Sequence, residues 1–270
     1  MILINGQERD TIPVDDRGLA YGDGLFRTLV IRGGMPVAWR HHYRKLSHDC
    51  AVLGIPCPEE SVWMEDLIRL SRCEPACVVK ITVTRGRGAR GYAGPATAQP
   101  TRILSTGPIP AYPAGWLKDG VRLHLCRMRL GHQPGLAGVK HLNRLENVLA
   151  RMEWRDPGTA EGLLLDQEGN VIEGTMSNVF ALRAGVLYTP DLGRCGVAGV
   201  TRDRIMALAP ELALPLQVRN FPLPFLLQAE EVFLCNSVIG VWQVREAGEK
   251  TWDRGGLTGT IRRLLDEKND

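Results

Sequence analysis

Two stretches decide how this chain is interpreted: Gly138-Val-Lys-His-Leu-Asn-Arg-Leu-Glu-Asn-Val-Leu-Ala-Arg151 and, after it, Glu173-Gly-Thr-Met-Ser-Asn-Val-Phe180. In the first, Lys140 stands just ahead of residues 143–154, where an apolar residue recurs at helical spacing, which predicts an amphipathic helix. The apolar residues of that helix are Leu145, Val148, Leu149 and Met152. In the second, Glu173 closes a predicted short strand. Either residue alone is also typical of an ordinary surface position, so the information lies in the pair.

A lysine followed by such a carboxylate is the pair of residues that a pyridine aldehyde cofactor requires. A lysine amine can form a Schiff base with an aldehyde, and a carboxylate can keep a pyridine nitrogen protonated; pyridoxal 5'-phosphate needs both from a protein. A free lysine has a pKa near ~10.4, so Lys140 needs burial or cationic neighbours, such as His141 and Arg144, to act at neutral pH. The pair predicts pyridoxal 5'-phosphate, with Lys140 as its attachment point and base, and Glu173 at its ring nitrogen.

A third stretch, Asp16-Arg-Gly-Leu-Ala-Tyr-Gly-Asp-Gly-Leu-Phe26, precedes these two. In this order the three motifs resemble the class IV (fold type IV) pyridoxal-phosphate enzymes over nearly the whole chain, and within that group they look most like the aminodeoxychorismate lyases. The resemblance implies a two-domain fold like that of D-amino acid aminotransferases. It implies a smaller N-terminal α/β domain, a larger C-terminal mixed, barrel-like domain, and a homodimer.

Composition argues against several other classes. The 270 residues are 44% hydrophobic and 23% charged, values typical of globular proteins with a sizeable core. The net charge of +3 is too small to indicate nucleic-acid binding. No apolar run approaches the ~18 residues of a membrane span, and the first residues do not have the form of a signal peptide. Seven cysteines without a Cys-x-x-Cys pair predict reduced thiols, a cytoplasmic location and no metal site.

Short strands interspersed with helices predict an α+β fold in two domains. Residues 1–107 are expected to form the N-terminal domain, with helices near residues 42–53 and 59–71. Residues 108–115 are rich in proline and glycine and are the predicted linker. Residues 116–270 are expected to form the domain that binds pyridoxal phosphate.

The cofactor's phosphate group requires hydrogen-bond donors. Gly199-Val200-Thr201 opens a predicted helix, and the N–H groups and dipole at a helix N-terminus favour an anion. Asn236-Ser237, after another predicted strand, is a second candidate, and Asn178 at the end of the Glu173 motif is expected beside the cofactor. We therefore expect Val200, Thr201, Asn236, Ser237 and Asn178 among the cofactor-binding residues.

The family resemblance adds a phosphate-binding arginine in a His-x-x-Arg-Leu pattern. Here that pattern reads His42-Tyr-Arg-Lys45-Leu46, so Lys45 stands at the arginine position. A lysine supplies a point charge but lacks the bidentate fork of arginine. Arg44 would project from a different side of the helix, so Lys45 is the predicted phosphate ligand.

A glycine-rich loop, residues 85–92, carries Arg85, Arg90 and Tyr92. It contains no nucleotide-binding fingerprint. Cationic and hydrogen-bonding side chains on a mobile loop suit a dicarboxylate substrate, so these three residues are the predicted substrate contacts.

The resemblance also implies a reaction. It places Thr28 beside the cofactor, where its hydroxyl could protonate a leaving ether oxygen. The implied activity is a lyase that converts 4-amino-4-deoxychorismate to 4-aminobenzoate and pyruvate, a step towards folate. Two alternatives remain open: an aminotransferase of D-alanine or branched-chain amino acids, and a binding protein without cofactor on the same scaffold.

Overall fold

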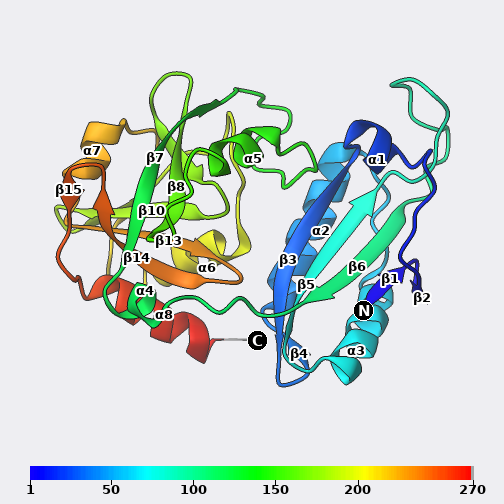
Figure 1. Ribbon diagram of the computed structural model, residues 1–270, viewed down its shortest axis with the longest axis horizontal. Coiled ribbons are helices and arrows are strands. Elements are labelled where there is room, and N and C mark those ends of the chain that lie inside the picture. The colour runs from blue at the N-terminus through cyan, green and yellow to red at the C-terminus, as the bar shows by residue number, and fades with distance from the viewer. Residues whose placement is uncertain (269–270) are drawn as a thin grey trace. The chain divides into compact units, whose positions relative to one another are not determined.

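The computed structural model describes residues 1–268 and divides the chain into two compact units (Figure 1). Unit 1 contains Met1–Pro110 together with the short segment Val139–Asn143, and unit 2 contains Ala111–Gly138 and residues 144–268. Each unit is built on one sheet with a few helices, which confirms the predicted α+β class.

Unit 1 has a six-stranded antiparallel sheet in the order β2-β1-β6-β5-β3-β4 (Figure 1). Its strands are β1 (Ile2–Ile4), β2 (Gln7–Glu8), β3 (Gly24–Arg32), β4 (Met35–Pro36), β5 (Cys77–Thr84) and β6 (Thr101–Gly107). Its helices are α1 (Arg17–Tyr21), α2 (Trp39–Leu53) and α3 (Glu60–Cys73).

The two long helices of unit 1, α2 and α3, cover one face of its sheet. Alternate residues of the central strands β3 and β5 pack with both helices in one buried apolar cluster; they include Leu25, Leu29, Val79, Ile81 and Val83 from the strands, and Leu46, Trp63 and Leu67 from the helices. Side chains alternate along a strand, so the residues between these point to the opposite face of the sheet.

The segment Val139–Asn143 pairs with the beginning of β3. The N–H of Phe26 donates to the Lys140 carbonyl (2.9 Å), and the N–H of Leu142 donates to the Gly24 carbonyl (2.9 Å). A Cβ at Gly24 would lie 2.4 Å from the Val83 carbonyl oxygen, so only glycine allows this approach of three segments. The sequence interpretation assigned Lys140 to the C-terminal domain, whereas these strand-like contacts assign it to unit 1.

Unit 2 has a nine-stranded mixed sheet in the order β12-β11-β10-β13-β14-β7-β8-β9, with β15 paired to β14. Its strands are β7 (Val121–Leu130), β8 (Thr159–Asp166), β9 (Val171–Gly174), β10 (Asn178–Arg183), β11 (Val186–Thr189), β12 (Leu216–Val218), β13 (Glu231–Asn236), β14 (Gly240–Ala247) and β15 (Lys250–Thr251). Its helices are α4 (Ala114–Lys118), α5 (Leu145–Arg151), α6 (Val200–Leu208), α7 (Leu223–Leu227) and α8 (Leu257–Glu267).

Helices α6 and α8 pack on unit 2's sheet through a buried apolar cluster that includes Phe180, Ile205, Phe233 and Ile261. Helix α5 behaves differently. It is shorter than the predicted helix, and its apolar stripe of Leu145, Val148, Leu149 and Met152 is exposed. The helical spacing therefore predicted the helix correctly. An amphipathic helix usually buries its apolar face, whereas this one exposes it. Within residues 1–268, no helix is both long and apolar enough to cross a membrane.

Candidate active site

Lys140 is held through its backbone and lies beside an aromatic ring. Its N–H donates to a carboxylate oxygen (Oδ2) of Asp49 on α2 (3.1 Å), while its carbonyl accepts from Phe26 of β3. The Lys140 Nζ lies 4.5 Å from the centroid of the Phe26 ring, a cation–π distance. Bonds at both its N–H and its carbonyl hold the backbone that carries the amine.

The Asp49 carboxylate is itself fixed within unit 1. Its side chain is 1% exposed and pairs with Arg27 of β3, which is also buried. The ring Nδ1 of His48 lies 3.2 Å from the other carboxylate oxygen. Asp49 thereby joins α2, β3 and the Lys140 segment, a role for which the sequence had no signal.

Thr28 lies on the face of unit 1's sheet opposite to α2 and α3. It is two residues after Phe26 on β3, so the two side chains share one face. Lys80 stands opposite Thr28 on β5, and its Nζ lies 5.1 Å from the Phe26 ring centroid. Thus the amines of Lys80 and Lys140 both approach one ring on the face that carries Thr28. Sequence reasoning missed Lys80, although alternation along two paired strands would have placed it there.

Lys45 lies on α2, one turn before Asp49, so both project from the same side of that helix. It is half-buried, and its carbonyl accepts a long bond from the Arg27 guanidinium (3.4 Å). Its position as a phosphate ligand stays a prediction.

In unit 2, Glu173 is a buried carboxylate on β9. Its side chain accepts the N–H of Val197 (2.8 Å) and, over 3.4 Å, the side-chain amide of Asn147. Asn178 supports the same segment, because its amide donates to the Val197 carbonyl (2.7 Å) and its oxygen accepts the N–H of Gly199 (3.1 Å). The Glu173 motif therefore holds residues 197–199, which lead directly into α6.

The Asn178 side chain bonds the backbone that leads into α6. Both polar atoms of the Asn178 side chain are bonded to the backbone before α6. A Cβ at Gly199 would lie 2.3 Å from the Asn178 side-chain oxygen, so the loop and the amide are fitted to each other. Asn178 therefore shapes the beginning of α6, and its contact with the cofactor stays a prediction.

The N-terminus of α6 presents donors for an anion. The helix starts at Val200, and Gly199 at its N-cap supplies no side-chain cap. The hydroxyls of Thr201 and Ser237 lie 3.4 Å apart. Asn236, in contrast, uses its side chain within the protein: its amide donates to the Met176 carbonyl, and its oxygen accepts two backbone N–H groups of the following turn. The structure thus groups Val200, Thr201 and Ser237, with Asn236 supporting the turn beside them.

A second buried carboxylate, Glu161, holds the turn after Glu173. It accepts from the hydroxyls of Thr175 and Ser177 and from the N–H groups of Gly162, Thr175 and Met176. Burial raises the pKa of the Glu161 carboxyl, against the lowering effect of these bonds. These bonds to Glu161 explain why the motif that follows Glu173 contains Thr175 and Ser177.

The expected role of Arg85 in substrate binding does not fit the structure. Its guanidinium bonds Asp23 (2.8 Å) and the carbonyls of Leu53 and Gly54 (both 2.7 Å) at the end of α2. These bonds use three of its five donors inside unit 1. Arg85 therefore anchors the beginning of the glycine-rich loop.

The rest of this loop is also held rather than loose. The buried Arg17 guanidinium bonds Asp23 and donates to the carbonyls of Gly91, Tyr92 and Ala93. Arg90 is exposed, and the Tyr92 side chain is 90% exposed beside the Tyr21 ring. Arg90 and Tyr92 thus lie on an anchored surface loop, and their contact with a substrate stays a prediction.

Comparison with known proteins identifies relatives along almost the entire chain. A family model described as amino-transferase class IV matches residues 24–247. An aminodeoxychorismate lyase of Vibrio harveyi is 35% identical over 241 residues, 89% of each chain. A putative branched-chain-amino-acid aminotransferase of Methanocaldococcus jannaschii is 30% identical over 99% of this chain and 94% of its own length. The crystal structure of 4-amino-4-deoxychorismate lyase from Pseudomonas aeruginosa superposes with a TM-score of 0.95, at 46% identity and 99% coverage of both chains.

Proposed function

Because the chain belongs to the class IV aminotransferase family, we propose that it is a pyridoxal-phosphate-dependent lyase that converts 4-amino-4-deoxychorismate to 4-aminobenzoate and pyruvate. Two of the relatives described above carry the name of this lyase, and one of them is 46% identical over 99% of both chains. Such similarity over the full length supports a shared activity and not only a shared fold.

The residues present fit pyridoxal phosphate. An anion needs N–H and hydroxyl donors, which Val200, Thr201 and Ser237 supply at the start of α6. A pyridinium nitrogen needs a buried carboxylate, which Glu173 supplies. An aldehyde needs a lysine with a fixed backbone, and Lys140 has one. When bound, the cofactor supplies an electron sink for a carbanion.

We assign Lys140 as the attachment point and as the base that removes the proton from the amine-bearing ring carbon of the substrate. Glu173 would hold the proton on the ring nitrogen of the bound cofactor, and Lys45 would add a positive charge for its phosphate. Asn178 and Asn236 serve by shaping the backbone around that phosphate site.

Thr28 is the proposed acid for the leaving group. The observation that carries this assignment is that Thr28 shares one face of β3 with Phe26, whose ring the Lys140 amine approaches. As Lys140 takes the ring proton, the carbon–oxygen bond to the enolpyruvyl group breaks and the Thr28 hydroxyl protonates the departing oxygen. The ring becomes aromatic, and the released enol gives pyruvate.

Substrate carboxylates need cations, and Lys80 replaces Arg85 in this assignment. Lys80 lies on the face that carries Thr28, whereas the Arg85 guanidinium is bonded to Asp23 and α2. Arg90 and Tyr92 are retained as proposed contacts for the second carboxylate because both side chains are exposed on the adjoining loop.

The proposal includes a cytoplasmic homodimer that acts in folate biosynthesis. The exposed apolar stripe of α5 supports the homodimer, since Leu145 is 74% and Met152 71% exposed although both are strongly apolar. All seven cysteines are free thiols, as expected of a protein in a reducing compartment.

The test is a direct competition of two reactions. Purified protein with its cofactor is incubated with 4-amino-4-deoxychorismate, and pyruvate and 4-aminobenzoate are measured; equal amounts of both are expected. In parallel, D-alanine or a branched-chain amino acid is supplied with 2-oxoglutarate. Faster transamination than pyruvate release from aminodeoxychorismate would reject the lyase in favour of an aminotransferase.

A further inference from the structure

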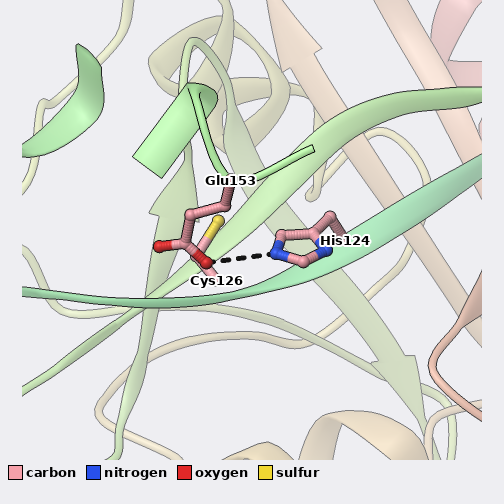
Figure 2. Close-up of side chains that lie close together, drawn as sticks. All are labelled: His124, Cys126 and Glu153. Atoms are coloured by element: carbon pink, nitrogen blue, oxygen red, sulfur yellow. Dashed lines mark hydrogen bonds and ion pairs between the residues drawn. The ribbon is translucent and has the colours of Figure 1, made fainter. Parts of the chain in front are cut away.

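Three side chains with metal-binding atoms converge in unit 2 where β7 meets the end of α5. His124 and Cys126 are two residues apart on β7 and share one face, while Glu153 follows α5 (Figure 2). One ligand atom from each lies within 4.8 Å of the other two. The lyase proposal uses none of these residues.

The spacing of the nitrogen and oxygen atoms is close to that around a zinc ion. The His124 Nε2 lies 3.1 Å from Oε2 of Glu153 (Figure 2). Tetrahedral Zn²⁺ holds such ligands at about 2.0–2.2 Å, which puts them about 3.3–3.6 Å apart. The thiol of Cys126 lies within 4.8 Å of the other two atoms and must approach them by about 1.3 Å at most to complete a set of one nitrogen, one oxygen and one sulfur ligand.

Neighbouring groups already orient the ligands. The Glu153 carboxylate accepts the N–H groups of Arg127 (2.7 Å) and Met128 (2.8 Å), which a bulge in β7 directs towards it. The His124 ring stacks on Trp154, with ring centroids 5.4 Å apart. Such supporting contacts lower the cost of arranging ligands around an ion.

The local charge also favours a cation. The Glu153 carboxylate adds a negative charge beside the Cys126 thiol, and this charge attracts a divalent ion, which displaces the thiol proton to solvent when it binds. Arg127 opposes it, because its Nε lies 3.8 Å from the Glu153 carboxylate, but its side chain is 89% exposed. The Arg129 guanidinium is bonded to nearby backbone carbonyls.

We propose that His124, Cys126 and Glu153 form a Zn²⁺ site with three protein ligands and a fourth position open to water. The mixed nitrogen, sulfur and oxygen set suits Zn²⁺ and excludes Mg²⁺ and Ca²⁺, which prefer oxygen ligands. The His124 side chain is 31% exposed, which gives the ion a path from solvent. Bound zinc ties β7 to the end of α5. Glu153 is too far from His124 and Cys126 in the sequence for the three to form a recognisable motif.

The test uses the full chain with its cofactor. Zn²⁺ binding is measured by equilibrium dialysis, and Co²⁺ is added as a spectroscopic probe, since tetrahedral Co²⁺ with a thiolate ligand gives intense visible bands. One equivalent is expected in the wild type. Cys126→Ala should weaken binding by more than about 100-fold, above the loss typical of a supporting residue. Cys195→Ala removes another buried thiol of unit 2 and is the matched control.

Arg127→Ala separates a real site from loose surface binding. Removing this competing cation should tighten zinc binding several-fold while leaving the three ligands in place. Equal binding by wild type and Cys126→Ala, or an octahedral Co²⁺ spectrum, overturns the proposal, as does the absence of stoichiometric binding. Thermal unfolding of every variant verifies that each is folded, and a rise of the midpoint with zinc is expected for wild type and not for Cys126→Ala.

Discussion

Replacing Asp49 tests whether a buried ion pair positions the proposed catalytic lysine. The Asp49 carboxylate pairs with Arg27 and accepts the Lys140 N–H, and its side chain is 1% exposed. Removing one partner of a buried ion pair costs about 3–5 kcal/mol. The hydrogen bond from the Lys140 N–H contributes about 1.5–3 kcal/mol to stability. It is made to the same carboxylate, so its loss is largely included in the cost of removing the ion pair.

The variant is Asp49→Ala, and its matched control is Asp66→Ala. Asp66 of α3 forms a comparable, largely buried ion pair with Arg102 in the same unit, and the Lys140 segment takes no part in it. Both variants should unfold at lower urea concentration than wild type. Only Asp49→Ala should also weaken cofactor attachment, because only there does the backbone of Lys140 lose an acceptor.

Two measurements separate the effects. Urea unfolding gives the loss of stability, and titration of cofactor-depleted protein with pyridoxal phosphate, followed by borohydride reduction, gives the fraction attached to Lys140. A typical domain is stable by about 5–15 kcal/mol, so both variants should remain folded at low temperature. If Asp66→Ala weakens attachment as much as Asp49→Ala does, the effect is general destabilisation and the positioning argument is refuted.

Four other predictions follow from the assigned roles. Borohydride reduction and peptide mapping should label Lys140, with no label in Lys140→Ala; label on Lys80 instead would contradict the assignment. Thr28→Ala should slow pyruvate release by about 10²–10⁴-fold, while the absorbance of the lysine-bound cofactor stays unchanged. Lys45→Ala should weaken cofactor affinity by about 1–3 kcal/mol and Lys45→Arg should preserve it, as measured by cofactor titration. Burial acts to raise the pKa of the Asp23 carboxyl, but hydrogen bonds from Arg85 and Arg17 lower it below 3.8 overall. Its stabilising effect is therefore present above that pH and lost as the pH falls through the folded pKa, and Asp23→Asn should flatten the acid side of a plot of unfolding midpoint against pH.

Much of the fold could be predicted because its signals are local. The helix expected near residues 42–53 is α2, which ends at Leu53, where Gly54 adopts a left-handed conformation at the helix C-terminus. Residues Gly199 and Thr201 likewise marked the start of α6. In each case residues close in sequence determine the structure.

The contacts of charged side chains could not be predicted in this way. Arg85 was interpreted as a substrate ligand because a cation on a glycine-rich loop suits a carboxylate. Its actual partners, Asp23 and the carbonyls of Leu53 and Gly54, lie 62, 32 and 31 residues away in the sequence. Asp49 is 91 residues from Lys140 and left no signal at all. A single sequence indicates which side chains are charged but not which distant groups they bond.

The motif that contains Lys140 shows the same limit within one continuous stretch. Up to Asn143 the backbone pairs with β3 and belongs to unit 1, and from Arg144 onward it belongs to unit 2. Helical spacing describes only the second half, whose apolar face is exposed. The lysine therefore takes its position from strand-like bonds to β3 and from the Asp49 carboxylate, and the helix that made it conspicuous in the sequence presents its apolar residues to solvent or to a second subunit. For this reason we expect different effects from the two kinds of variant. Variants of Asp49 should weaken cofactor attachment, and variants of the apolar stripe of α5 should weaken the association of subunits.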